Sequence, residues 1–340
     1  MGVNQFRPRN GPRRRLPGAR LAWTVDLGED LTAPVTDGTH AFVMDDEGTL
    51  SAISVAAGEV DWQADLGGQS VGHSPLVAGG VVLAGSSEPN QVEAFDAASG
   101  AVRWTVPDLF YTGAPAAFRD TAIVGTGGDV VALGLADGKE RWRATLPQDV
   151  GVWSGLVVAG DAVVLGTDDG KVAALDAATG RVRFVTPGPN SSESQPMWGV
   201  TVVGGTVIAF DDDSDVSGVA LDTGALRWTL DAHARHPGVM AALGRDAAVA
   251  LDSRQVLVLD PATGRERRRL SGEVSSLAAL PGARPLLAMA QLGSLRAVAP
   301  DGRQVWTVSL PSPAIYLAMG KGVPVAVDPA GKVTGYRLAT

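Results

Sequence analysis

A glycine followed four residues later by an aromatic residue recurs along this chain of 340 residues, and the repeat restricts the fold more than any other feature. The glycines of successive pairs are separated by 38 to 44 residues. The pairs are Gly58/Trp62, Gly100/Trp104, Gly138/Trp142, Gly180/Phe184, Gly224/Trp228, Gly264/Arg268 and Gly302/Trp306, of which only Gly264/Arg268 lacks the aromatic residue. A period of this size is typical of repeat architectures in which each unit packs against its neighbours.

Each unit contains short apolar segments for about four β-strands. An alternating strand and an Asp-x-x-Ser/Thr-Gly turn precede the glycine, as in residues 92–100, 172–180 and 256–264. Asp, Ser and Thr side chains bond turn amides, and glycine adopts the positive φ that a β-carbon disfavours. Further upstream lie apolar runs such as residues 80–83 and 162–165. Four strands per unit predict one blade of a β-propeller, with no long helices.

The number of aromatic strands predicts eight blades in a closed ring. An eighth such strand, residues 21–27 with Trp23, precedes the first complete unit, while residues 314–338 supply only three strands. Pairing of the N-terminal strand into the C-terminal blade would close the ring and leave no long unpaired edge. We therefore predict an all-β fold, a single eight-bladed β-propeller of four-stranded blades over residues 20–340, with each tryptophan packed between blades.

The repeat Ala-x-Asp-x-x-Thr-Gly-x-x-x-Trp resembles that of the PQQ-like β-propeller family, over about residues 20–340. The family includes quinoprotein dehydrogenases and outer-membrane assembly scaffolds, and its Gly and Trp residues are structural. We expect no PQQ-dependent dehydrogenase and predict no cofactor, because those enzymes are much longer and their adjacent cysteine pair has no counterpart in a chain without cysteine. The assembly-scaffold branch is not expected either, because its members are exported lipoproteins and neither an export signal nor a cysteine for lipidation is present.

Charge is divided unevenly along the chain. The formal net charge is −9, but six arginines lie in the first twenty residues, so the remainder carries −15: Arg7, Arg9, Arg13, Arg14, Arg15 and Arg20. An acidic body is a poor phosphate binder, so we expect no nucleic-acid partner. Residues 1–19, rich in Arg, Pro and Gly, are predicted to be a disordered basic arm.

Location is predicted from the absence of targeting segments. No run of 18 apolar residues is present, so we expect no membrane span. The basic N-terminus lacks the hydrophobic segment of a secretory signal. The sequence as it stands predicts a soluble, monomeric, cytoplasmic protein, or an exported one if a signal has been removed.

Polar and aromatic residues cluster at or just before the innermost strands of the predicted blades, near the mouth of the central channel. Function is expected there, because the loops between blades meet at that rim. The residues are His73, Tyr111, Trp153, Ser154, Trp198, His236 and Ser276. Two interpretations stay open: Tyr111, Trp153, Trp198 and His236 line a binding pocket, or these side chains plug the channel and pack between blades.

The four histidines have different expected roles. His73 at the mouth is the candidate acid/base or hydrogen-bonding residue, since an imidazole there can titrate near neutrality. His40 falls within a second strand and is expected to be structural. His233 and His236 share an inter-blade loop, but two histidines without a third ligand make a weak zinc signal, and a solvated loop explains them as well.

An acidic run replaces the short loop of the fifth blade. In extended backbone Asp211, Asp213 and Asp215 would project to one side, as an oxygen-rich array suited to Ca²⁺. A solvated acidic turn is the alternative. No catalytic triad, phosphate loop or zinc-protease motif is present.

Two functions therefore compete. One is a non-catalytic scaffold that presents its channel-mouth loops to a protein or small-molecule partner. The other is a small-molecule enzyme, a cyclase, lyase or hydrolase, with a rim pocket formed by His73, Tyr111, Trp153, Trp198 and the acidic loop.

Overall fold

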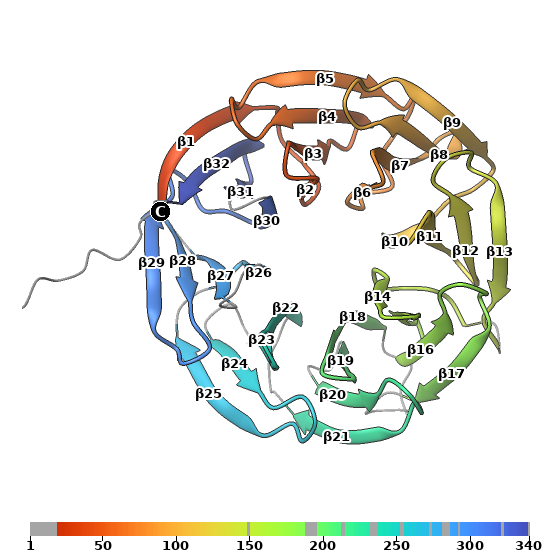
Figure 1. Cartoon of the computed structure of the whole chain (residues 1–340), viewed down its shortest axis with the longest axis vertical. Coiled ribbons are helices and arrows are strands. Elements are labelled where there is room, and N and C mark those ends of the chain that lie inside the picture. Colours follow the sequence, from red (N-terminus) through yellow and green to blue (C-terminus); the bar gives the residue numbers. More distant parts are fainter. Residues whose placement is uncertain are drawn as a thin grey trace, which may run out of the picture.

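The computed structural model is a ring of eight antiparallel sheets, each of four strands (Figure 1). It describes residues 19–147, 150–187, 196–211, 215–231, 237–251, 255–271, 274–280, 286–291, 293–320 and 323–338. The eight blades predicted from the repeat are confirmed. The predicted basic arm, residues 1–19, lies outside the described residues apart from Ala19, with which β1 begins. No described segment forms a helix long and apolar enough to cross a membrane.

The strands occupy four positions from the channel outward. The innermost strands are β2 (Val35–Thr36), β6 (Leu76–Ala78), β10 (Thr112–Phe118), β14 (Val157–Ala159), β18 (Met197–Val203), β22 (Pro237–Leu243), β26 (Ser276–Leu280) and β30 (Tyr316–Gly320). The second strands are β3 (His40–Met44), β7 (Val81–Ser87), β11 (Thr121–Thr126), β15 (Ala162–Gly166), β19 (Thr206–Asp211), β23 (Asp246–Leu251), β27 (Leu286–Gln291) and β31 (Val323–Val327). The innermost strands of neighbouring blades contact each other all around the ring.

The third and outermost strands complete the blades. The third strands are β4 (Thr49–Ser54), β8 (Asn90–Asp96), β12 (Asp129–Gly134), β16 (Lys171–Asp176), β20 (Asp215–Ala220), β24 (Gln255–Leu259), β28 (Ser294–Val298) and β32 (Lys332–Leu338). The outermost strands are β5 (Val60–Asp65), β9 (Val102–Pro107), β13 (Glu140–Thr145), β17 (Val182–Pro187), β21 (Leu226–Asp231), β25 (Glu266–Ser271), β29 (Gln304–Ser309) and β1 (Ala19–Asp26). Blade 1 is β2–β5, and blade 8 consists of β30–β32 with β1.

The two ends of the described chain close the ring. Strand β1 pairs with β32 in antiparallel register, with Trp23 opposite Gly335, as the sequence predicted for residues 21–27. Figure 1 shows the red N-terminal strand beside the blue C-terminal one in the same blade. Because β1 completes the last blade, the strands at the two ends of the described chain are paired with each other and leave no long unpaired edge.

Burial of the strands follows from their position between blades. The second and third strands have consecutive buried residues, as in Ala122, Ile123 and Val124 of β11, because neighbouring blades cover both faces of the sheet. Outermost strands such as β13 alternate between exposed and half-buried residues, because their outer side meets solvent. The hydrophobic core is therefore a ring of clusters, each shared by two adjacent blades.

The repeated glycine and tryptophan meet between blades. The indole of Trp62 in blade 1 lies over Gly100 in blade 2, where a Cβ would be 2.7 Å from the ring, and its Nε1 donates to the carbonyl oxygen of Ala97 over 3.1 Å. Trp104 meets Gly138 and the Leu135 carbonyl in the same way. The contact confirms the predicted inter-blade packing, and in blades 1–5 and 8 it joins the aromatic residue to the glycine of the following unit.

In blades 2, 3, 4 and 6 an aspartate of the turn pairs with an arginine of the outermost strand. Asp176 accepts from Arg183 over 2.8 Å and from the Thr179 hydroxyl over 2.9 Å, and these bonds lower the pKa of Asp176 to about 2. Arg103 and Ser99 lower the pKa of Asp96 to about 2 in the same way. Because the charged form is favoured in the folded state, the stabilisation is present above the unfolded pKa and disappears as pH falls toward the folded pKa.

We therefore expect the melting temperature to fall between about pH 4 and pH 2 as these carboxylates are protonated. The double variant Asp96→Asn/Asp176→Asn should melt at a lower temperature at neutral pH and lose less on acidification. Thermal melts from pH 7 to about pH 2 measure both effects. Glu47→Gln, in an exposed loop, is the control. A double variant with an unchanged pH profile would contradict the assignment.

Candidate functional site

Strand direction divides the loops between two faces of the ring. Successive strands run antiparallel, so the loops that join one blade to the next lie on the same face as the loops between second and third strands. We call this the channel-mouth face. The turns between first and second strands and between third and outermost strands lie on the opposite face, here the turn face. Loops on such a framework are where binding residues concentrate.

Backbone hydrogen bonds tie the loops of the channel-mouth face together. Leu66 N donates to Gly48 O over 3.1 Å, and Ser70 N donates to Asp46 O over 3.0 Å, so the loop after blade 1 is fastened to that blade's own hairpin. Thr32 N and Met44 O form an equivalent bond over 2.8 Å. The described loops around blade 1 are therefore held in place by backbone hydrogen bonds, which favours binding.

His73 and Tyr111 lie together, but below the surface. Their rings stack with centroids 6.4 Å apart and an interplanar angle of 30°. Tyr111 is fully buried among core residues of blades 2 and 3, and burial raises the pKa of its hydroxyl. Of the two interpretations of Tyr111, this burial favours packing between two blades over a place in the lining of a rim pocket. His73 is half-buried, and burial lowers the pKa of its imidazole.

Trp153 reaches the surface, whereas its neighbour Ser154 does not. The Trp153 side chain is 44% exposed in the loop between blades 3 and 4, and its backbone N donates to Gly166 O over 3.0 Å. Ser154 is buried, and its Oγ accepts from Gly166 N over 2.7 Å. Ser276 is buried in β26. Of this group, Trp153 is the residue that a ligand can touch.

Several of the remaining predicted site residues have side chains that the structure does not describe. Trp198 belongs to β18, but its side chain is not described, and His233, His236 and Asp213 fall in undescribed loops. Asp211 is buried, and its Oδ1 accepts from Asp215 N over 2.9 Å, so this carboxylate contributes to the turn. Among the described residues, no three His, Asp or Glu side chains are placed to hold a metal ion.

Two exposed aromatic residues join Trp153 on this face and were not singled out in the sequence. Phe110, in the loop between blades 2 and 3, is 40% exposed, and Tyr316, at the start of β30, is 37% exposed. Within the described part of the chain, these three are the exposed aromatic side chains. Only their position in loops beside innermost strands could have indicated them, because the other described Trp, Tyr and Phe side chains are buried or half-buried.

The described loops of the channel-mouth face carry acidic residues and no lysine or arginine. The acidic residues are Glu29, Asp30, Asp45, Asp46, Glu47, Glu88, Asp108, Asp168, Asp169 and Asp328. The described turns of the opposite face mix both signs, with Arg119, Lys139, Arg181, Arg245, Arg265 and Arg303 among their acidic residues. The described loops of the channel-mouth face therefore carry an excess of negative charge.

A pocket of about 300 Å³ opens on this face where blades 8, 1 and 2 meet. Tyr316 lines it together with Asp30, Asp45, Asp46 and Asp328. Asp328 is buried and accepts from Lys332 N over 2.8 Å, so its carboxylate stabilises its own hairpin. The pocket thus offers one aromatic side chain and several carboxylates, a surface suited to a cationic group.

Comparison with known families extends these observations. A family model of the PQQ_2 type, described as outer membrane protein assembly factor BamB, matches residues 16–154 and 147–276. Outer membrane protein assembly factor BamB of Yersinia pestis is 28% identical over 237 residues, which cover 61% of this chain and 59% of that protein. The protein of the same name from Nitrosomonas eutropha is 31% identical over 167 residues, 47% of this chain and 40% of that protein. The matched part is thus less than two thirds of the length of either relative.

The ring also resembles solved structures. The crystal structure of BamB from Moraxella catarrhalis superposes with a TM-score of 0.71 at 18% identity, over 94% of this chain and 97% of that one. At this identity the likeness concerns the fold alone, so it supports the eight-bladed ring and assigns no residue a role.

Proposed function

The chain belongs to the PQQ-repeat family described as outer membrane protein assembly factor BamB, and from this membership we propose that its ring is a non-catalytic scaffold that binds a protein partner. The partner docks on the channel-mouth face and takes part in the assembly of outer membrane proteins, as the names of the relatives suggest. One observation carries the choice of face: the exposed aromatic side chains of the described residues gather there, among carboxylates.

Family membership corrects two expectations drawn from the sequence. The cytoplasmic location is wrong, because the matched relatives are named as outer membrane protein assembly factors. The expectation that the chain lies outside the assembly-scaffold branch is also wrong, because the family model of that branch matches it.

The composition of the channel-mouth face supports a protein partner. Trp, Tyr and Phe are enriched at the centres of protein interfaces, where an aromatic side chain buries a large area at a low cost in conformational entropy. Trp153, Phe110 and Tyr316 offer such anchors. The surrounding carboxylates would attract a partner with a basic rim and speed its association at low salt.

The enzyme alternative has less support from the site. It required a rim pocket shared by His73, Tyr111, Trp153 and Trp198, and Tyr111 is fully buried. A protein-binding face does not need these residues to converge. It needs a rigid surface with exposed anchors, which the hydrogen-bonded loops around Trp153 provide.

Site-specific photo-crosslinking tests the proposed face. A photoreactive phenylalanine analogue placed at Trp153 or Phe110, in the full chain expressed in its own host, should crosslink to a protein partner on irradiation. Because a docked partner covers these anchors, the crosslinked product should form in high yield. Mass spectrometry of this product should identify the partner as a component of outer membrane protein assembly.

Matched controls come from exposed apolar residues of the outer wall. Val102 in β9 is 57% exposed and Leu226 in β21 is 47% exposed, so the analogue at either position meets solvent to a similar degree. These positions should give no adduct. Equal crosslinking from the outer wall and the channel-mouth face, or crosslinking from the outer wall alone, would overturn the proposed face.

A further inference from the structure

Blade 6 departs from the repeat at the residue that packs against the next blade. Where blades 1–5 and 8 place an aromatic ring over the glycine of the following unit, β25 supplies Arg268, whose Nη1 and Cδ lie 2.9 and 3.2 Å from the Cβ position of Gly302. In blade 3 the equivalent residue is Trp142, which covers Gly180 and donates its Nε1 proton to Ala177 O over 3.3 Å. Blade 6 therefore has a charged, slender side chain where a broad ring is the rule.

Arg268, in place of the aromatic residue, lies beside a large pocket on the turn face. Between blades 6 and 7 a pocket of about 600 Å³ is lined by Leu243, Gly244, Arg245, Asp246, Arg267, Arg268, Pro300 and Asp301. The corresponding pocket between blades 3 and 4, lined by Arg119 and Arg141, has about 220 Å³. An arginine side chain fills less space than an indole beside the next blade, so the larger opening follows from the change.

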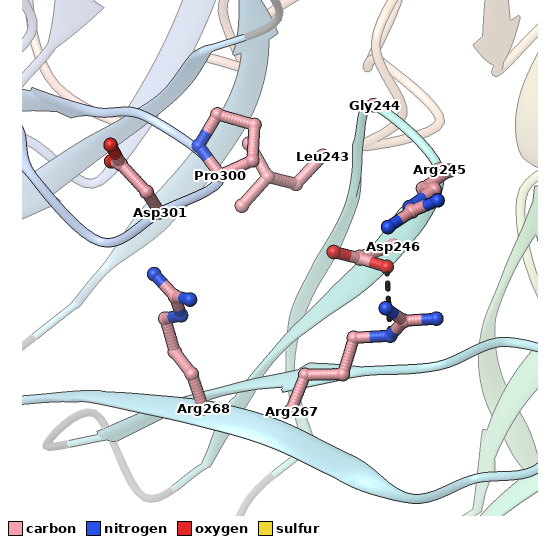
Figure 2. Close-up of a pocket in the computed structure, with 8 residues that line it drawn as sticks. All are labelled: Leu243, Gly244, Arg245, Asp246, Arg267, Arg268, Pro300 and Asp301. Carbon is pink, nitrogen blue, oxygen red and sulfur yellow. Dashed lines mark ion pairs between the residues drawn. The ribbon is translucent and has the colours of Figure 1, made fainter.

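The turn that forms the far wall of the pocket also differs. In blade 7, Gly302 N donates to Ala299 O three residues earlier over 2.8 Å, whereas in blade 4 Gly180 N donates to Asp176 O four residues earlier. The shorter turn brings Pro300 and Asp301 to the edge of the opening. Figure 2 shows Arg268 directed toward this turn, with Arg245 and Asp246 on the hairpin across the pocket.

The charges that line the pocket do not balance. Arg267 forms ion pairs with Asp246, at 3.2 Å, and with Asp260. Asp301 lies 3.8 Å from the Arg303 guanidinium. Arg245 and Arg268 have no hydrogen bond or ion pair with any described residue. Two guanidinium groups thus face one opening without a described acceptor for their donors, and Arg268 is half-buried there.

We propose that this pocket binds a carboxylate of an acidic peptide segment, with Arg268 and Arg245 as its cationic partners. The planar guanidinium presents paired N–H donors that match the two oxygens of a carboxylate. Leu243 and Pro300 offer apolar contact for the methylene stem that carries an aspartate or glutamate carboxylate. The site lies on the turn face, opposite the channel-mouth face, so this second binding site is independent of the function proposed above.

Fluorescence anisotropy with a labelled tetraglutamate peptide tests the site on the full chain. Wild-type protein should bind the peptide saturably, and the matching tetraglutamine peptide should not bind. Arg268→Trp, which restores the indole of the other blades, and Arg245→Ser should each weaken binding at least about tenfold, since each removes one charge-assisted contact. Melting temperatures of both variants confirm that the ring remains folded.

A matched control lies on the same face of the ring. Arg119→Ser changes an arginine in the corresponding turn of blade 3, beside the smaller pocket, and should leave tetraglutamate binding unchanged. The inference is overturned if Arg268→Trp and Arg245→Ser, both folded, bind the peptide as the wild type does. It is also overturned if inorganic phosphate displaces the peptide at equal concentration, because the site would then select small anions and not peptides.

Discussion

Replacing Trp23 with alanine is expected to lower the free energy of unfolding by about 3–5 kcal/mol, because the indole is buried at the seam where the two ends of the chain meet. Its Nε1 donates to Val55 O over 2.8 Å, and the ring lies against Gly58 of blade 1 and Gly335 of β32. The change removes contacts on both sides of the seam at once. Equilibrium unfolding in urea measures the loss.

A neighbouring residue provides the control. Leu21 lies on the same strand, and its side chain is 52% exposed, so Leu21→Ala should change the free energy of unfolding by no more than about 0.5 kcal/mol. Similar losses for the two variants would show that β1 contributes through its backbone pairing and not through the indole. A Trp23 variant as stable as the wild type would contradict the packing described here.

Gly331→Ala should be the second strongly destabilising change, because the glycine lies where two backbone segments of the seam approach each other. Its φ is +73°, and a Cβ would be placed 1.2 Å from the carbonyl oxygen of Gly28. Leu27 N donates to Gly331 O over 3.1 Å, so moving this backbone also disturbs the pairing of β1. We expect a loss of about 1–2 kcal/mol from the left-handed conformation and about 1–3 kcal/mol more from the collision.

The preceding blade contains the matched control for this prediction. Gly293 occupies the same hairpin position in blade 7, has φ +70° and has no atom within 4 Å of its Cβ position. Gly293→Ala should therefore show the conformational cost alone. Thermal and urea unfolding of both variants would separate the two contributions. Equal losses would mean that the hairpin of blade 8 relaxes freely and that the seam does not depend on this close approach.

The seam matters for the proposed scaffold because the channel-mouth face is continuous only in a closed ring. The pocket that Tyr316 lines is formed by blades 8, 1 and 2, on both sides of the junction. Variants that loosen β1 should therefore change this part of the face first, whereas Trp153 and Phe110 lie two to three blades away. Binding carried by Trp153 should persist in a destabilised but folded Trp23 variant.

Local pattern was sufficient to predict the blades. The Asp-x-x-Thr-Gly turn and the alternating strand before it are encoded within a dozen residues, and their physical basis is equally local: aspartate bonds to turn amides, and glycine accepts a positive φ. The incomplete last unit and the extra strand around Trp23 also indicated the ring closure. These features depend on order along the chain, which a sequence displays directly.

The candidate site was less predictable, because exposure at a loop depends on the neighbouring blade. Tyr111 and Trp153 occupy similar places before innermost strands, yet the first is fully buried against blade 2 and the second is 44% exposed. The sequence shows that Arg268 replaces the aromatic residue of the repeat. The pocket beside Arg268 could not be predicted in this way, because it also depends on the turn of the next blade.

The amino-acid pattern alone was enough to establish the number of blades, the strand order within each blade and the pairing of the two chain ends, because strand period and turn chemistry act over a few residues. The tertiary structure was needed to show which aromatic side chains reach solvent, that the described channel-mouth loops form one acidic face, and that Arg245 and Arg268 share an opening. These properties arise between blades, from residues about forty positions apart or more, and the free energy of packing across that interface decides them.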